Sequence, residues 1–469
     1  MSLFLEDFDQ WYEHYSEASP QEQYQLLLEV ISKPIPLELA EKEDIASLLI
    51  DVQGLLEGNN LIEQALAFTA TFQQQQPELY QQEFYYFDNF PIRVALFNQA
   101  VESIDQALAR YQQEPVKSID SLLPMLDDLR FYGARDQAVE ISRAVYVPVA
   151  TSRGLLGGSE DDFGAVVITD LLEQAYQQIQ QGHPVDWEAW GQEAKPFSFE
   201  NTPELRQEIA QNISGQVLGG PEIITLFQQD PSVLFPQLLL RFNIQMANQY
   251  QLSFVCSQSI WSAVMSFLEE RELSDKQLSH PGHFFSINAK ELDRYVGGLI
   301  GGFLSSYQSK GFATLWGIPH VYDFLRAAGV ITDSVYESAI QVSTDLQEML
   351  LKHWQRPLWR YSFVHRWGKP AYQTEADFEA EAKRFADTFN DSESLSTEPT
   401  EKPDWGARFS DVVGKAVEKM ASDQAPAKSP APVKNFKAPK PRKSRLQEIK
   451  ALGKKSKGAK KKKKKGKGF

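Results

Sequence analysis

Apolar residues recur along most of the chain at intervals of three and four, the spacing that places them on one face of an α-helix. The first such stripe consists of Phe4, Phe8, Trp11 and Tyr15. Ser19 then opens the sequence Ser-Pro-Gln-Glu, which combines an N-cap hydroxyl, a proline suited to the first helical turn and a capping-box glutamate. The pattern predicts two successive amphipathic helices near the start of the chain.

Three further helix starts are predicted where a serine or threonine precedes an apolar stripe. Ser159 is followed by three acidic residues, which favour the positive end of a helix dipole, and Gly182 is expected to end that helix. Thr202 and Thr374 begin the other two helices. We expect each hydroxyl to cap its helix by accepting a backbone hydrogen bond.

Only two short segments, residues 83–90 and 146–152, alternate in the way expected of a β-strand. Segments this short do not make a stable sheet on their own. The chain is therefore predicted to be all-α.

The longest uncharged stretch, residues 242–268, is predicted to be a core helix because six amide side chains interrupt it. The chain has no transmembrane segment by this criterion, and Met1 is not followed by the charged and then apolar segments of a secretory leader. Its single cysteine, Cys256, excludes a disulfide framework and a cysteine-based zinc or iron–sulfur site. We expect a cytoplasmic protein in which Cys256 is an inert core thiol.

Two predicted helices, over residues 61–72 and 137–145, each follow a glycine-containing break and carry a small residue, Ala65 or Ala138, near their start. This layout resembles the helix–turn–helix unit of tetratricopeptide or HEAT-type solenoids. The spacing between the two units is not constant, and the later part of the chain does not repeat it. The predicted body is either an irregular helical bundle or a solenoid-like repeat array.

Changes in composition divide the chain into four predicted regions. Residues 1–190 form an N-terminal helical domain and residues 191–390 a second one, because glycine, proline and tryptophan interrupt the helical pattern between them. Residues 391–424 have the composition of an acidic linker with a short amphipathic helix. Residues 425–469 are a lysine- and proline-rich tail that is predicted to be disordered.

Charge is distributed very unevenly among these regions. The net charge of −16 combines 47 basic and 63 acidic residues. Residues 1–390 hold 25 basic and 54 acidic residues, whereas residues 425–469 hold 18 basic residues and one acid, Glu448. The body should repel phosphate polymers and the tail should attract them.

The tail is the strongest candidate for a polyanion-binding element. Lysine is a strongly hydrated point charge that suits non-specific attraction to phosphate, and only two arginines in the tail offer a bidentate fork. The alternative is a solubilising or self-associating tail that folds back on the acidic body. The predicted polyanion-binding residues are Arg442, Lys443, Arg445, Lys454, Lys455, Lys457, Lys460, Lys461, Lys462, Lys463, Lys464 and Lys465.

One segment of the body, residues 349–374, contains no acid and alternates basic with aromatic side chains. Aromatic rings stack on bases and arginines hold phosphates, so the segment is a candidate site for single-stranded nucleic acid or another anionic ligand. Arginine and tryptophan also pack together as cation–π pairs in helical cores, which is the alternative. The candidate residues are Arg356, Arg360, Arg366 and Trp359.

Motifs for catalysis, metal binding and cofactor binding were not found. The chain has no Walker-type phosphate loop, no His-Glu-x-x-His and no Gly-x-Ser-x-Gly. His280 and His283 flank a Pro-Gly pair and are expected to be exposed in a turn. The glycine-rich run at residues 297–302 is expected to support close packing between helices. We therefore predict no catalytic residue, no metal and no cofactor.

These observations favour a non-enzymatic helical adaptor. Its tail would tether it to nucleic acid or a ribonucleoprotein, and its helical body would bind a protein partner. One alternative is a peripheral membrane protein whose tail meets anionic lipid. The other is an enzyme that uses residues 349–374.

Overall fold

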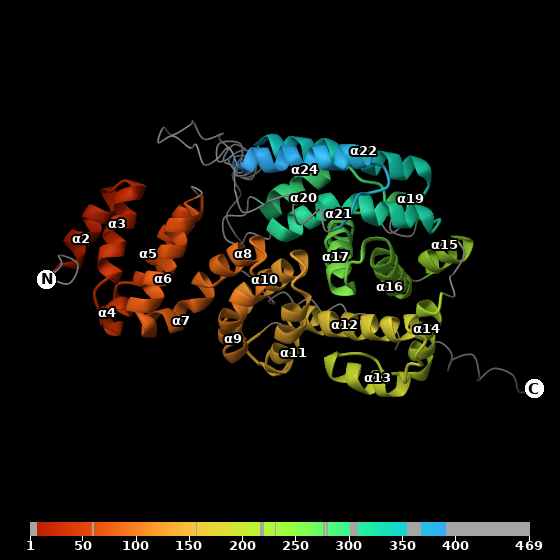
Figure 1. The fold of residues 1–469 in the computed structure, drawn as a ribbon, viewed down its shortest axis with the longest axis horizontal. Coiled ribbons are helices and arrows are strands. Elements are labelled where there is room, and N and C mark those ends of the chain that lie inside the picture. Colours follow the sequence, from red (N-terminus) through yellow and green to blue (C-terminus); the bar gives the residue numbers. More distant parts are fainter. Residues whose placement is uncertain are drawn as a thin grey trace, which may run out of the picture. The chain divides into compact units, whose positions relative to one another are not determined.

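A computed structural model describes residues 7–58, 61–155, 157–215, 220–229, 231–274, 277, 280–300, 308–353 and 367–390. Within these residues all regular secondary structure is helical, with 21 α-helices, two 3-10 helices and no strand (Figure 1). The predicted all-α class is confirmed. The chain divides into two units, Met1–Asn390 and Asp391–Phe469, and every described helix belongs to the first.

The helices of the first part of the chain are α2 (Phe8–Glu17), α3 (Pro20–Ile31), α4 (Leu37–Lys42), α5 (Ile45–Gly58), α6 (Ile62–Gln75), α7 (Pro77–Phe87), α8 (Asn89–Phe97), η1 (Val101–Ile104), α9 (Asp105–Gln113), α10 (Ile119–Phe131), α11 (Arg135–Thr151) and α12 (Asp161–Gln180). Those of the second part are α13 (Trp187–Ala194), η2 (Lys195–Phe197), α14 (Pro203–Ile213), α15 (Gly220–Gln229), α16 (Pro231–Tyr250), α17 (Phe254–Glu270), α19 (Pro281–Phe284), α20 (Ala289–Ile300), α21 (Gln308–Ala327), α22 (Asp333–His353) and α24 (Glu375–Asn390).

Three of the four predicted helix caps are present. Ser19 and Glu22 form a reciprocal capping box at α3, in which each side chain accepts a hydrogen bond from the backbone N–H of the other. The hydroxyls of Thr202 and Thr374 accept backbone hydrogen bonds at the starts of α14 and α24, each over 3.2 Å. The prediction for Ser159 is wrong, because α12 starts two residues later with Glu160 as its N-cap residue.

Both predicted strand segments are helical. Residues 83–90 span the end of α7 and the start of α8, and residues 146–152 cover the end of α11. Phe84, Phe87 and Phe90 are fully buried. Phe84 and Phe87 are three residues apart on one face of α7, and Phe90 is in the first turn of α8, so the run of aromatics follows a helical period and only resembles strand alternation.

The uncharged stretch at residues 242–268 forms two helices where one was predicted. Helix α16 ends at Tyr250, and Gln251 adopts a left-handed conformation with φ 55°. Ser253 then caps α17 by accepting a hydrogen bond from the N–H of Cys256. Across the described ranges, no helix combines the length and the apolar character needed to cross a membrane.

Close packing at glycine occurs on α21 and not at the predicted glycine pair. Gly297 and Gly298 are exposed on α20, and a Cβ atom added to either would have no neighbour within 4 Å. A Cβ on Gly317 of α21 would instead lie 2.7 Å from the Cγ2 atom of Ile260. The prediction for Gly297 and Gly298 is therefore wrong, and the rest of that run, residues 301–302, lies outside the described residues.

Helix α17 forms the centre of the second part of the fold (Figure 1). It contacts α10, α12, α16 and α21, and most of its side chains are buried. From α2 to α9, by contrast, helices contact mainly their near neighbours along the chain. Helix α13 spans the predicted boundary at residue 190 and contacts both α12 and α14. The division of this unit into two domains stays a prediction.

Candidate functional site

The predicted polyanion-binding residues between 442 and 465 lie outside the described residues. The same holds for Arg356, Arg360, Arg366 and Trp359, so their roles stay predictions. The C-terminal end of the basic–aromatic segment is described. Trp367 is completely buried, with its ring edge-on to Phe131 at a centroid distance of 5.5 Å. The Tyr250 hydroxyl donates to the Lys369 carbonyl over 3.1 Å. This end of the segment belongs to the core.

The two histidines of the Pro-Gly turn are exposed, as predicted. His280 is the N-cap residue of α19, where its Nδ1 atom accepts a hydrogen bond from the N–H of Gly282 over 3.1 Å. Cys256 is buried on α17. In the ranges that the structure describes, no three histidine, cysteine or acidic side chains cluster in a way that could hold a metal ion.

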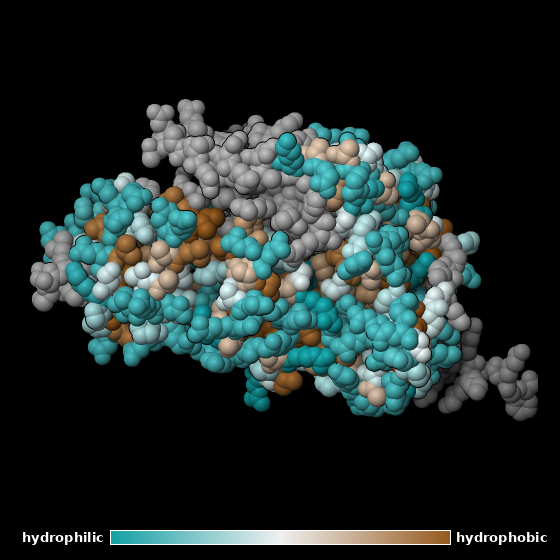
Figure 2. All heavy atoms as spheres, in the orientation of Figure 1, coloured by the Kyte–Doolittle hydropathy of each residue, from teal (hydrophilic) through white to brown (hydrophobic). Residues whose placement is uncertain are grey.

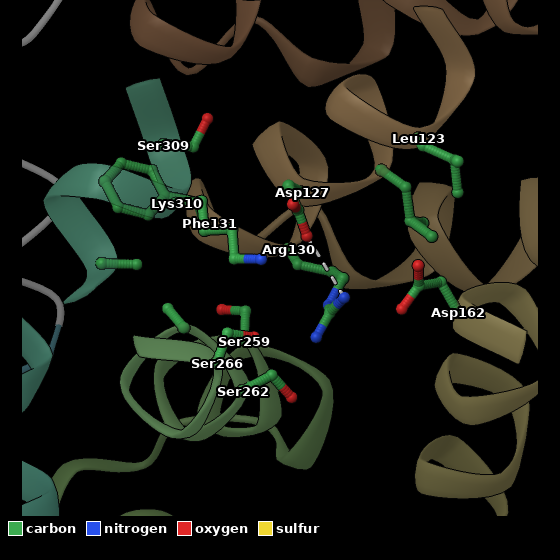
Figure 3. Close-up of a pocket in the computed structure, with 13 residues that line it drawn as sticks. Leu123, Asp127, Arg130, Phe131, Asp162, Ser259, Ser262, Ser266, Ser309 and Lys310 are labelled. Atoms are coloured by element: carbon green, nitrogen blue, oxygen red, sulfur yellow. Dashed lines mark hydrogen bonds and ion pairs between the residues drawn. The ribbon is translucent and has the colours of Figure 1, made fainter. Parts of the chain in front are cut away.

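A polar cavity of about 270 Å³ lies where α10, α12, α17 and α21 meet (Figure 3). Its charged lining consists of two acids, Asp127 and Asp162, and two bases, Arg130 and Lys310. In Figure 3 the Arg130 guanidinium and the Lys310 amino group both point into the space between α10 and α17. Charged groups inside a helical core need partners.

Arg130 is the central cation of the cavity and is only 5% exposed. One of its terminal nitrogens, Nη1, lies 3.3 Å from a carboxylate oxygen of Asp127, one helical turn earlier on α10. Its Nε atom is buried and has no hydrogen-bond partner among the described residues. Arginine stays protonated in proteins and carries five donors. The end of the guanidinium thus brings a positive charge to the cavity, while its Nε atom is enclosed by protein.

The two acids differ in their surroundings. Burial raises the pKa of Asp127, and the positive charges of Arg130 and Lys310 oppose that rise. Asp162 lies in the first turn of α12 and forms no ion pair with any described residue. Asp127 therefore orients Arg130, whereas Asp162 supplies a negative charge to the wall of the cavity.

Four serine hydroxyls complete the polar lining. Ser259, Ser262 and Ser266 are spaced by three and four residues on α17, so they lie on one face of that helix, and Ser309 comes from α21. Ser259 donates to the carbonyl oxygen of Cys256 over 2.7 Å, which leaves its lone pairs free to accept. Hydroxyls both donate and accept, so this face suits the oxygen atoms of a ligand.

The hydroxyl of Ser309 connects the cavity to a carboxylate behind it. It donates to Oδ1 of Asp128 on α10, and the Nε atom of Arg93 lies 3.5 Å from the other carboxylate oxygen. Burial raises the pKa of Asp128 to about 7, although Arg93 opposes this effect. Asp128 thereby fixes the start of α21 next to Lys310.

A second charged cluster shows how a structural ion-pair network differs from the cavity. Arg135 on α11 pairs with Asp170 and Glu173 on α12. Glu173 also accepts a hydrogen bond over 3.0 Å from the N–H of Phe254, at the first residue of α17. Every member of this cluster has a partner. Its role is to join three helices.

Sequence patterns did not identify the cavity, although two weak signals were present. Asp127 and Arg130 stand at the i, i+3 spacing of a helical ion pair. Ser259, Ser262 and Ser266 recur at helical spacing in a largely apolar helix. Neither signal reveals that α10, α12, α17 and α21 meet at one point.

The chain matches no protein-family model, no curated protein and no solved structure. Its function must therefore be inferred from its own residues. They contribute two separate features: a lysine-rich segment outside the described helices, and a cationic, hydroxyl-lined cavity within them.

Proposed function

We propose that the protein is a non-enzymatic helical adaptor of the cytoplasm whose C-terminal segment, residues 425–469, attaches it to nucleic acid or a ribonucleoprotein. The observation that carries this proposal is the division of charge along the chain. The segment holds 18 basic residues and one acid, while residues 1–390 hold 54 acids and 25 bases. Such opposed charge is typical of proteins that use a basic tail to reach a polyanion.

The composition of the segment favours phosphate contacts without base readout. Sixteen of its 18 basic residues are lysines, and six of them form the unbroken run 460–465. Each neutralised phosphate releases condensed counterions, so affinity should fall steeply as salt is added. Base recognition needs bidentate side chains held against a groove edge. A lysine run does not supply them.

The acidity of residues 1–390 favours separate binding roles for the body and the tail. Its net negative charge disfavours direct contact with a phosphate backbone. Figure 2 shows a largely hydrophilic face with smaller apolar areas among the described residues. Exposed large apolar side chains such as Tyr12, Tyr86 and Val147 come from different helices. We propose that this helical surface binds a protein partner while the tail holds the polyanion.

Binding of the full-length chain to mixed-sequence RNA at two salt concentrations tests the proposal. The first variant lacks residues 425–469, and the second carries the same residues in scrambled order. We expect deletion to abolish binding near physiological salt. Scrambling should preserve it, because charge and not order sets the affinity. The scrambled variant is the matched control, since its net charge and length equal those of the parent.

The same titrations include duplex DNA and vesicles that contain anionic lipid. Tail-dependent binding to vesicles without binding to nucleic acid would replace this proposal with a peripheral membrane protein. A complete absence of tail-dependent binding to any of these polyanions would overturn it. Loss of binding on scrambling would show that a specific motif, and not charge, is recognised.

A further inference from the structure

The cavity between α10, α12, α17 and α21 has a property that the proposed function does not use. Arg130 is more than nine-tenths buried, and Asp127 is its one ion-pair partner among the described residues. Hydrogen bonds to a charged donor are stronger than those between neutral groups. A ligand that supplied an acceptor to the end of the guanidinium that faces the cavity would add a charged hydrogen bond on binding.

We propose that this cavity binds the single oxyanion group, a carboxylate or a phosphate, of a small organic molecule. Arg130 would donate from the end of its guanidinium that points into the cavity, while its pair with Asp127 holds the group in place. Lys310 reaches the same space from α21 and forms no ion pair in the described part of the chain. Two cations that converge on one volume are a standard arrangement for holding an oxyanion.

The serines of α17 extend the site beyond the charged group. Ser262 and Ser266 line the cavity, and neither hydroxyl is hydrogen-bonded to another described residue, so both remain available. Hydroxyl groups on the ligand would match them, because serine both donates and accepts. The volume of about 270 Å³ limits the occupant to a small molecule.

The two acids set an upper limit on the charge of the ligand. Asp127 and Asp162 both line the cavity, so its formal charge is balanced before a ligand enters. A triphosphate or a nucleic-acid backbone would be repelled by both carboxylates. A ligand with one oxyanion group meets Arg130 and Lys310 with the least opposition. The site is thus distinct in its chemistry from the polylysine segment.

The test measures binding of inorganic phosphate and of lactate to the full-length chain by calorimetry at fixed ionic strength. Lys310→Gln removes the cavity cation that is not part of an ion pair. Lys290→Gln, on the exposed face of α20, is the matched control. We expect saturable one-site binding of at least one probe to the parent, affinity at least tenfold weaker in Lys310→Gln, and no change in Lys290→Gln. The tail is identical in all three proteins, so it cannot produce the difference.

Ser262→Ala is a second variant that leaves every charge in place. It should fold like the parent and weaken binding several-fold, which keeps the test informative if Lys310→Gln unfolds. Binding of phosphate alone would assign the site to phosphate, and binding of lactate alone would assign it to carboxylate. The proposal is overturned if neither probe binds saturably, or if Lys310→Gln and Ser262→Ala both bind as tightly as the parent. Such a failure would leave the tail proposal intact, because that proposal is tested with polyanions.

Discussion

Asp88 and Arg110 form a two-point ion pair in the core of the first part of the chain. The Nε atom of Arg110 lies 2.7 Å from Oδ2 of Asp88, and its Nη2 atom lies 2.8 Å from Oδ1. The Asp88 side chain is only 3% exposed, and the hydroxyl of Tyr80 also donates to it. Because Asp88 stands between α7 and α8 while Arg110 is on α9, the pair joins the junction of two helices to a third.

Replacing only one member of this pair should be strongly destabilising. We expect Asp88→Asn to lower the free energy of unfolding by about 3 kcal/mol, since it leaves the partly buried guanidinium of Arg110 without its counter-charge. Urea denaturation followed by circular dichroism measures the change. Adding Arg110→Met to Asp88→Asn should recover part of the loss. Asp293→Asn, at an exposed position on α20, should change stability by less than about 0.5 kcal/mol.

Alanine substitutions at two glycines should have opposite effects. Gly317→Ala places a Cβ against Ile260 and should cost about 1–3 kcal/mol through overpacking. Gly298→Ala fills open space on an exposed helical surface and should stabilise by about 0.5 kcal/mol, since alanine has the higher helix propensity. Thermal unfolding of both variants measures the two stability changes. Equal shifts would contradict the packing of α21 against α17.

His320 on α21 should make stability depend on pH in the acidic range. Its ring is 2% exposed, edge-on to Tyr250 and Trp367, and both ring nitrogens lack hydrogen-bond partners among the described residues. Burial lowers the pKa of His320 from 6.5 to about 4. Protons therefore bind more readily to the unfolded chain. The contribution of neutral His320 to the free energy of unfolding is fully present above pH 6.5 and is lost as the pH falls to about 4.

His320→Leu isolates this effect from the many acids that also titrate. Between pH 6.5 and about 4, the unfolding free energy of the parent should fall relative to that of the variant by about 1.4 kcal/mol per pH unit. Above pH 7 the difference between the two proteins should be constant. A difference that stays constant down to pH 4.5 would contradict this, because it would show that His320 binds a proton as readily in the folded protein as in the unfolded chain.

Deleting residues 425–469 should leave the helical unit folded. The deleted segment has few large apolar side chains, so it cannot contribute much to a core. We expect the truncated chain to keep the helical circular dichroism signal of the parent, compared per mole of protein. It should also unfold in a cooperative thermal transition. Loss of the helical signal at room temperature would show that the segment is required for folding.

Local features of the sequence were sufficient to predict the helical class and several helix ends. The capping box of Ser19 and Glu22 and the caps at Thr202 and Thr374 depend on groups only three residues apart. Such contacts form in the same way whatever surrounds the helix. The contrast in charge between residues 1–390 and 425–469 is likewise a property of composition alone.

Tertiary contacts determine the features that local sequence patterns predict wrongly or miss. The aromatic run at residues 83–90 resembles a strand until the burial of Phe84 and Phe87 on one helical face is known. Glycine density at residues 297–302 suggested close packing, but the helices approach each other at Gly317. The polar cavity is the clearest case. Arg130 and Lys310 are 180 residues apart along the chain. Only the packing of α10 and α21 around α17 brings their charges into one space. Local spacing does not predict this, because it does not determine which distant helices pack together.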